Sequence, residues 1–313
     1  MWFKNLVVYR LGADWSRKAE DFEEKLAQQP LQKCGGFQME SSGWTSPQHE
    51  GQFLYQQNRQ WLFALGVEQK LLPGSVIRQV AEERIADLEA KLTHPLGRKQ
   101  KRDIKEKVTA ELMPRAFSRR QKTYGWMDTA NGWLFINAAG EPMAEKFTEA
   151  LRKTEDALSL TRLETQVSPA TCMSRWILAG EADGPFGIDD DLELRAPDAS
   201  KATVRYFRHG LGGKDIRDHI SGGKQPVRLG LTWNDRISFV LTEQLHVKRL
   251  AFTEIVEREG GEEVEDEDER FDMDFALMTG ELSRMLADLV KALGGEKRAE
   301  ARAAGRSLEE SMA

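Results

Sequence analysis

The sequence predicts an α+β protein of two loosely similar mixed α/β halves, with a long helical arm in the first half. Runs rich in aromatic and branched residues, typical of strands, alternate with segments in which apolar residues recur every three or four positions, typical of helices. At 313 residues the chain is long enough for two modest domains or one elaborate one. We expect residues 1–160 to form the first half, residues 161–296 the second, and residues 297–313 a disordered tail.

The first half is predicted to begin as a strand followed by a helix. Residues 2–11 have the composition of a strand, and the helix is expected over residues 16–29, where Pro30 stops it. A loop-like stretch at residues 41–52 then precedes a strand at residues 60–67.

The helical arm is expected over residues 76–113. Ser75 is a candidate N-cap for its first helix, which is interrupted at Pro95 and Gly97. The apolar face of this helix consists of Ile77, Ala81, Ile85, Leu88 and Leu92. A second helix is predicted over residues 98–113.

A hairpin and a helix complete the first half. Residues 124–128 and 133–137 are predicted to be strands around an Asn-Gly turn at residues 129–132, and a helix is expected over residues 141–158.

The second half repeats the alternation of helices and strands. We expect helices over residues 168–179 and 214–220, and strands over residues 203–208, 228–233, 237–242 and 248–255. A terminal amphipathic helix ends at Gly294-Gly295. Its predicted core-facing residues are Phe271, Phe275, Met278, Leu282, Met285, Leu286, Leu289 and Leu293.

Charge is unevenly distributed along the chain, whose net charge is −6. Residues 91–122 include eleven basic and three acidic side chains, and residues 201–249 include ten and four. Residues 254–274 carry twelve acidic and two basic side chains, most densely at residues 262–269, which we expect to be a solvated loop. Because a binding face responds to local potential, the acidic total does not exclude nucleic-acid binding.

One stripe of cations stands out on the second helix of the arm. Arg98, Lys101, Arg102 and Lys105 follow the spacing that brings side chains onto one face of a helix. Ile104, Val108 and Leu112 form an adjoining apolar stripe. One side of this helix can therefore pack while the other stays positive.

Motifs for nucleotide or metal chemistry are not found in the sequence. The Gly-Gly-Lys stretches at residues 212–214 and 222–224 lack the other residues of a phosphate-binding P-loop. The three aspartates at residues 189–191 are expected to cap a turn, and the histidines have no zinc-ligand spacing. We expect no metal, no cofactor and no enzymatic activity, although a catalytic site assembled from distant residues stays open.

The sequence lacks the signals of membrane and secreted proteins, which bears on its cellular compartment. No apolar run approaches the roughly 20 residues of a membrane span, and the start of the sequence does not have the pattern of a secretory signal. Cys34 and Cys172 lie far apart and are expected to be buried thiols. These features favour a cytoplasmic protein.

Several short stretches extend in order over residues 1–296. They are Met1-Trp2-Phe3-Lys4-Asn5-Leu6 with Tyr9-Arg10-Leu11, Leu72-Pro73 with Val76-Ile77, Leu112 with Pro114-Arg115-Ala116-Phe117-Ser118-Arg119, His219-Ile220 with Gly223-Lys224, and Arg270-Phe271-Asp272 with Asp274-Phe275 and Leu277-Met278-Thr279-Gly280-Glu281-Leu282. In these stretches the chain closely resembles the bacterial RdgC family of recombination-associated proteins.

The resemblance implies a ring-shaped, two-fold homodimer whose positively lined central hole encircles double-stranded DNA. It also implies binding without sequence preference, association with the nucleoid, and restriction of RecA access in recombination and replication-fork repair. Phe117 would lie at the dimer interface or the rim of the channel, with an ordinary core aromatic as the alternative, and Arg208 and His209 would lie near a second dimer contact.

Charge pattern and resemblance together suggest which cations contact phosphates. The hypothesised DNA-binding residues are Arg98, Lys101, Arg102, Lys105, Arg115, Arg119, Arg120, Arg208, Lys214, Lys224 and Arg228. Two alternatives stay open. The chain could be a protein-interaction adaptor with incidental DNA contact, or a nuclease or ATPase with a dispersed site.

Overall fold

The computed structural model describes residues 2–13, 15–48, 51–92, 94–254, 256 and 266–297. Within these residues twelve strands form one sheet, in the order β2-β4-β5-β6-β1-β12-β11-β10-β8-β9, with β3 beside β4 and β7 beside β1. All of the paired strands are antiparallel. The α+β class predicted from the sequence is therefore confirmed.

The elements have the following bounds. The strands are β1 (Asn5–Leu11), β2 (Glu40–Thr45), β3 (Leu54–Gln57), β4 (Gln60–Lys70), β5 (Ser118–Asp128), β6 (Trp133–Ile136), β7 (Leu160–Arg162), β8 (Phe186–Arg195), β9 (Thr203–Tyr206), β10 (Gln225–Trp233), β11 (Ile237–Thr242) and β12 (Val247–Phe252). The helices are α1 (Ala19–Ala27), α2 (Gly74–Leu92), α3 (Arg98–Leu112), the 3-10 turn η1 (Met113–Arg115), α4 (Glu141–Thr154), α5 (Pro169–Ala179), α6 (Lys214–Ser221) and α8 (Glu267–Ala292).

The two halves share the sheet, because β1 of the first half pairs with β12 of the second. The other edge of β1 pairs with β6 through Val7–Arg10. The C-terminal end of β1, Tyr9–Leu11, also pairs with β7. One sheet contains strands from both sides of the boundary expected at residue 160, and α8 packs against both parts of it. The division into two domains at this residue stays a prediction.

Helices cover the sheet unevenly. In the first half, alternate strand residues pack on both faces, with α1 and α4 on one side and α8 on the other. In the second half, α5 and α8 pack with strands β8, β10, β11 and β12 in one cluster of buried side chains. The opposite face of this part of the sheet is lined by charged side chains, which are described below.

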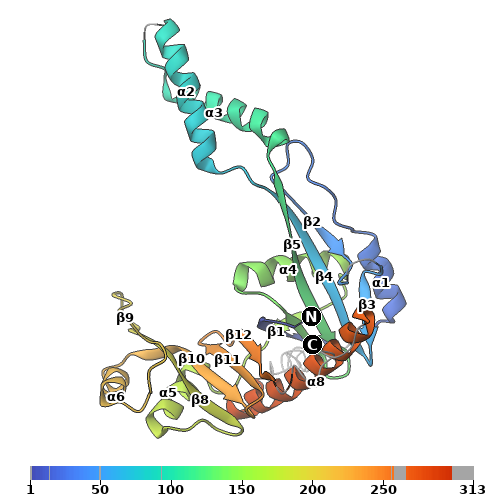
Figure 1. Cartoon of the computed structure of the whole chain (residues 1–313), viewed down its shortest axis with the longest axis vertical. Coiled ribbons are helices and arrows are strands. Elements are labelled where there is room, and N and C mark those ends of the chain that lie inside the picture. The colour runs from blue at the N-terminus through green and yellow to red at the C-terminus, as the bar shows by residue number, and fades with distance from the viewer. Residues whose placement is uncertain are drawn as a thin grey trace, which may run out of the picture.

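The arm is built from two helices at the end of a long two-stranded ribbon. Strands β4 and β5 pair over eleven residues and carry the chain out of the sheet toward α2 and α3 (Figure 1). Ile77, Ala81 and Val108 form a small core of the arm, separate from the two larger ones. The predicted face of α2 is therefore only partly confirmed, because Leu88 and Leu92 are exposed.

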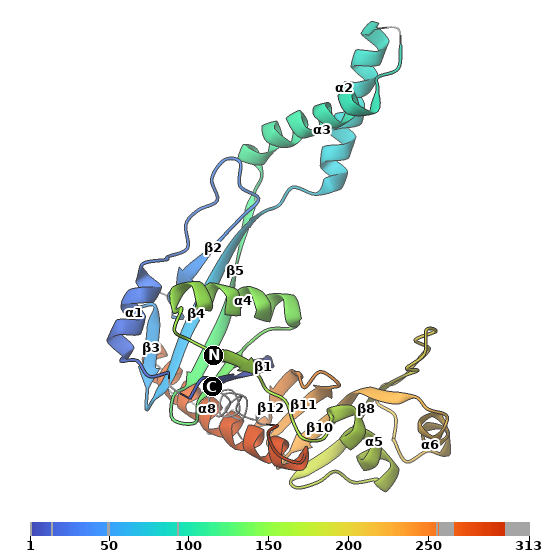
Figure 2. The ribbon, with the colours of Figure 1, turned by 180° about the vertical axis from the view of Figure 1, so that it is seen from behind.

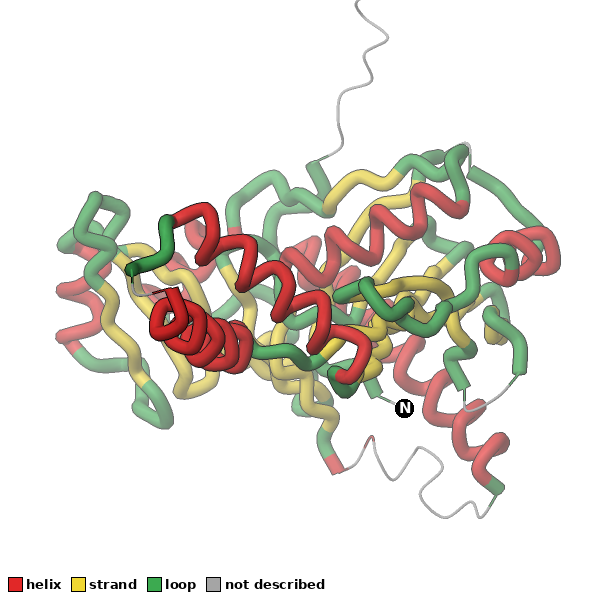
Figure 3. The backbone as a smooth tube through the Cα atoms, turned by 90° about the horizontal axis from the view of Figure 1, so that it is seen from above, coloured by secondary structure: helices red, strands yellow, loops and turns green. Residues whose placement is uncertain are grey.

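Other details of the arm differ slightly from the expectation. Helix α2 begins at Gly74, so Ser75 lies inside its first turn and is not the N-cap. Helix α3 begins after Gly97, whose backbone N–H donates to the Gln100 side chain at 2.9 Å. Seen from above, the two helices lie side by side in front of the sheet (Figure 3).

The terminal helix α8 confirms its predicted core face: seven of the eight expected residues are buried, and Phe271 is partly buried. The acidic run at residues 262–269 was expected to be a loop, and this is wrong for residues 267–269, which form the first turn of α8. Asp266 is the N-cap of α8, and its carboxylate accepts the backbone N–H groups of Asp268 and Glu269. Acidic residues are favourable in the first turn because they face the positive end of the helix dipole. Residues 262–265, and residues 298–313 of the expected tail, lie outside the described residues.

Two stretches of the sequence were interpreted wrongly. Residues 41–52 were expected to be a loop, but β2 occupies their first part. The aspartates at 189–191 were expected to cap a turn, but they lie in the middle of β8. Strands β3, over residues 54–57, and β7, over residues 160–162, were not predicted.

The molecule has the outline of a crescent (Figures 1 and 2). The arm forms one end, and β8, β9, β10 and α6 form the other. Strand β9 projects from that end on the side of the arm. None of the helices in the described ranges is long and apolar enough to cross a membrane.

Candidate nucleic-acid interface

The structure separates the eleven hypothesised DNA-binding residues into two groups at opposite ends of the crescent (Figure 1). Seven lie on the arm or where β5 leaves it: Arg98, Lys101, Arg102, Lys105, Arg115, Arg119 and Arg120. Four lie in the second half: Arg208, Lys214, Lys224 and Arg228. Ten are exposed and Lys224 is partly buried, so all can reach solvent, but the single chain does not bring the two groups together.

The stripe on α3 is exposed as predicted, but two of its cations have partners. The Lys101 ammonium lies 2.9 Å from Glu89, and Arg102 lies 3.5 Å from Glu106. The pKa of Glu89 is lowered, first because it accepts the backbone N–H of Leu96 and second because of Lys101. Exposed pairs of this kind contribute little to stability, so a phosphate can compete for these cations.

The base of the arm combines positive charge with an exposed aromatic ring. Arg120 donates from Nε to Glu68 at 2.9 Å, and the Ser118 hydroxyl donates to the other oxygen of Glu68 at 2.8 Å. These two contacts, with Ser118 the larger cause, lower the pKa of the Glu68 carboxyl. Phe117, between η1 and β5, is 84% exposed, and Phe37 is exposed as well.

A shallow groove of about 320 Å³ follows the open face of the sheet in the second half. The cations that line it are Arg205, Arg228, Lys248 and Arg249, and the carboxylates are Asp191 and Glu193. Tyr206 and Phe207, which is 64% exposed, complete one wall. We call this surface, together with Arg195 beside it, the sheet groove.

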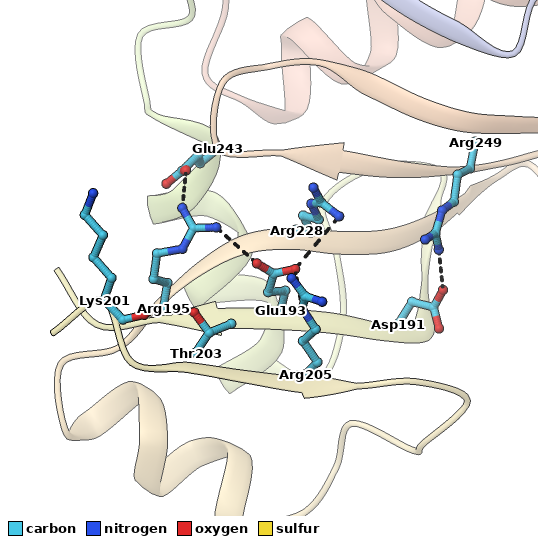
Figure 4. Close-up of polar contacts among 9 residues, drawn as sticks. All are labelled: Asp191, Glu193, Arg195, Lys201, Thr203, Arg205, Arg228, Glu243 and Arg249. Carbon is cyan, nitrogen blue, oxygen red and sulfur yellow. Dashed lines mark hydrogen bonds and ion pairs between the residues drawn. The ribbon is translucent and has the colours of Figure 1, made fainter. Parts of the chain in front are cut away.

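Glu193 lies at the centre of the cations of the sheet groove (Figure 4). It is only 4% exposed, and its carboxylate lies 3.1 Å from Arg195, 3.0 Å from Arg205 and 3.9 Å from Arg228. In the sheet, Glu193 on β8 is directly opposite Arg228 on β10 and Arg205 on β9. One buried carboxylate thus faces three arginines.

A β-bulge adds a further cation to the groove. The pairing of β11 with β12 shifts between Ser238 and Val240, so that β12 has one extra residue there. Arg249 lies in this bulge at φ 54°, a left-handed conformation that is uncommon for a residue with a side chain. As a result Lys248 and Arg249, adjacent in sequence, both line the groove instead of pointing to opposite faces.

The charges of the groove affect each other. Arg249 lies 3.6 Å from Asp191. The pKa of Lys248 is lowered, mainly by burial and then by the nearby positive charge of Arg228. Because neighbouring cations repel each other, an anion bound between them would reduce the electrostatic repulsion in the groove.

The remaining candidates follow Phe207, begin α6 or immediately precede β10. Arg208 has φ 51° and its guanidinium lies 5.3 Å from the ring centre of Phe207. His209 packs beside the ring of Tyr206. Lys214 begins α6, and the Lys224 ammonium lies 3.2 Å from the ring of His219.

Comparison with known proteins decides the family. A family model described as "RdgC: Putative exonuclease, RdgC" matches residues 1–296. This chain belongs to the RdgC family. The resemblance recognised in the sequence is therefore confirmed.

Curated RdgC relatives match over nearly their whole length. The chain is 48% identical to the recombination-associated protein RdgC of Dechloromonas aromatica, over 95% of this chain and 98% of the relative. It is 47% identical to that of Janthinobacterium sp. (95% and 99%) and 46% identical to that of Cupriavidus pinatubonensis (96% and 100%). All three relatives are named for recombination, whereas the family model is described by an exonuclease activity.

For this RdgC-family chain, the sequence alone identified only one cation of the sheet groove, Arg228. It missed Arg195, Arg205, Lys248 and Arg249, all of which are exposed or partly exposed. The available signal was the excess of basic residues over 201–249, but assigning these four to one face required the pairing of β8, which was not predicted. Among the described residues, no three His, Cys, Asp or Glu side chains are grouped to hold a metal.

Proposed function

We propose that this RdgC-family protein binds double-stranded DNA through backbone phosphates, without reading base sequence, and does so as a ring-shaped two-fold dimer. The observation that carries the proposal is the sheet groove, where Arg195, Arg205, Arg228, Lys248 and Arg249 share one open face. Cations on a surface without a deep pocket suit the regular spacing of phosphates, and phosphate contacts carry no base information.

The acidic net charge is compatible with this proposal. Binding depends on the potential at the contacting surface, and the groove and the α3 stripe are both local excesses of cations. Each phosphate that a cation neutralises releases condensed counterions, which favours binding most at low salt.

The crescent outline supports the dimeric ring. Exposed aromatic rings lie at two separate places on the crescent, Phe117 at the base of the arm and Phe207 beside Arg208 and His209 after β9. Exposed apolar rings favour protein contacts. Two crescents related by a two-fold axis and joined at both places would enclose a hole onto which both cation groups could face.

In the cell, we propose that the bound ring is associated with the nucleoid in the cytoplasm. There it would limit access of RecA to DNA in recombination and replication-fork repair simply by occupying the duplex. The names of the relatives support the link to recombination. No cofactor enters this mechanism.

Charge reversal tests the proposal. We expect full-length protein to bind unrelated duplexes with equal affinity, and log affinity to fall with log salt at a slope of about −0.9 per phosphate. One variant reverses the α3 stripe (Arg98, Lys101, Arg102 and Lys105 to Glu), and another reverses the groove (Arg205, Arg228, Lys248 and Arg249 to Glu). A matched control reverses four exposed lysines outside both groups, Lys18, Lys33, Lys153 and Lys291.

Fluorescence anisotropy over a salt series would measure all four proteins. We expect the groove and stripe variants to bind more weakly and with shallower slopes than the control. Unchanged binding by both would favour the alternative, a protein-interaction adaptor of the recombination machinery.

The exonuclease description of the family is the second candidate function. We propose that the chain is not an enzyme, and the assay is direct. End-labelled duplex would be incubated with the protein, Mg²⁺ and ATP. Release of nucleotides or of phosphate would contradict the proposal and identify a nuclease or an ATPase.

A further inference from the structure

The position of Glu193 is unusual for a carboxylate in an anion-binding surface. Such a surface gains affinity from positive charge, yet Glu193 lies inside the sheet groove at the point where its cations are closest together (Figure 4). By charge alone, Glu193 should weaken the binding of phosphates.

The geometry indicates what Glu193 contributes instead. Arg205, Glu193 and Arg228 occupy adjacent positions on β9, β8 and β10. Without the carboxylate, the arginines would repel each other across the strands and turn toward water. Since arginine side chains lose considerable rotamer entropy on being fixed, a partner that fixes them in advance lowers the cost of binding.

The arginines held by Glu193 keep donors for a ligand. The pair with Glu193 engages Nε of Arg205, one of five N–H donors of a guanidinium, and this side chain is 72% exposed. A buried carboxylate below exposed guanidinium groups orients them without covering them. Three arginines against two carboxylates, Glu193 and the exposed Glu243 beside Arg195, also leave the cluster positive.

We propose that Glu193 is a positioning residue, which holds Arg195, Arg205 and Arg228 in the geometry that contacts DNA phosphates. This inference rests on the proposed function. It assigns to a negative charge a favourable effect on the binding of a polyanion.

The substitution Glu193→Gln separates positioning from charge, because the two effects have opposite signs. It keeps the shape of the side chain and removes one negative charge. If Glu193 acts only through its charge, the variant binds DNA more tightly. If Glu193 positions the arginines, the variant binds about tenfold more weakly, the effect of losing one charge-assisted contact.

Glu181→Gln is the matched control. Glu181 is an exposed carboxylate between α5 and β8, outside the sheet groove, and its removal changes the charge by the same amount. We expect this variant to bind DNA as tightly as the unmodified protein or up to about twofold more tightly. Affinity of Glu193→Gln equal to or above that of Glu181→Gln would overturn the inference.

A double-mutant cycle measures the coupling between Glu193 and Arg205 in DNA affinity, which would be absent if Glu193 only supported the fold. Arg205→Gln should weaken binding in the unmodified protein and have much less effect in the Glu193→Gln background, because the arginine is no longer held. Equal effects in both backgrounds would contradict positioning. Circular dichroism would confirm that each variant is folded.

If Glu193→Gln does not fold, Glu193→Asp takes its place. Asp keeps the charge but withdraws the carboxylate by one methylene, so we expect weaker binding by a folded protein, and unchanged binding would overturn the inference. Failure of the unmodified protein to bind DNA would count against the proposed function. Normal binding with no effect of position 193 would count against this inference alone.

Discussion

Gly125 shows how tightly single residues are constrained where β5 passes under α4. A Cβ atom at this position would lie 2.3 Å from the Phe147 ring. Phe147 is fully buried, with the rings of Trp44 and Phe63 both 5.5 Å away, so it has little room to move.

We therefore predict that Gly125→Ala lowers the free energy of unfolding by about 2 kcal/mol, as overpacked cores do. Gly280→Ala is the control, because Gly280 lies in α8 with open space around it. Alanine favours helix over glycine, so this change should raise the free energy of unfolding by up to about 1 kcal/mol. Urea unfolding would measure both changes in the free energy of unfolding. A decrease, or an increase, in both variants would contradict the packing explanation.

His246 predicts a dependence of stability on pH. Its ring is buried between Arg162 and Glu141, at 2.6 and 3.0 Å. Burial, followed by the positive charge of Arg162, lowers the pKa of His246 from its ordinary 6.5. Below pH 6.5 the unfolded chain thus binds more protons at this position than the folded chain, and the free energy of unfolding falls as the pH falls through that window.

Urea unfolding between pH 7.5 and 5 would measure this slope. His246→Gln should make it shallower, whereas His94→Gln, at an exposed position, should leave it unchanged. An identical slope in the protein and both variants would show that other groups determine the acid sensitivity.

At the scale of elements, regular periodicity was the reliable signal. The sequence predicted α3, α8 and the β5–β6 hairpin because their apolar spacing, caps and Asn-Gly turn are local features. It missed β8, whose three aspartates disfavour a strand. There Thr232 of β10 donates to Asp189 at 2.9 Å, and Arg249 pairs with Asp191, so partners distant in sequence stabilise the strand.

The arm should unfold independently of the sheet, because its core is separate and small. We predict that Val108→Ala increases hydrogen exchange of the α2 and α3 amides about tenfold, from a loss of about 1.5 kcal/mol. Amides of β4 near Leu62 should keep their protection. Equal acceleration in the arm and in the sheet would show that the two unfold together.

At the scale of the whole molecule, the fold class and family were predicted from the sequence, but the arrangement of the cations was not. Charge excesses along the chain indicated where cations gather, and the structure divides them between the two ends of the crescent. No local pattern reports that division, because it depends on the length of the β4–β5 ribbon and on the pairing of β1 with β12.

A closed ring predicts slow loss of DNA that has no ends. We expect the protein to dissociate from nicked circular DNA much more slowly than from short linear DNA at high salt, where phosphate contacts are weak. Phe117→Asp should abolish this difference by opening one dimer contact, while Lys33→Asp should preserve it. Competition assays with labelled circles would measure it, and equal rates for circles and linear DNA would exclude encirclement.

The pairing of Asn5 and Leu6 with Lys248 and Val247 joins β1, the first of the described strands, to β12, the last of them. During synthesis, the first strand emerges from the ribosome long before this partner exists. Until then, the backbone N–H and C=O groups on this edge of β1 are unpaired, and a strand of a second nascent chain could pair with them. Contacts this distant in sequence also slow folding, so the sheet should close late and co-translational chaperones should matter most for chains stalled before residue 247.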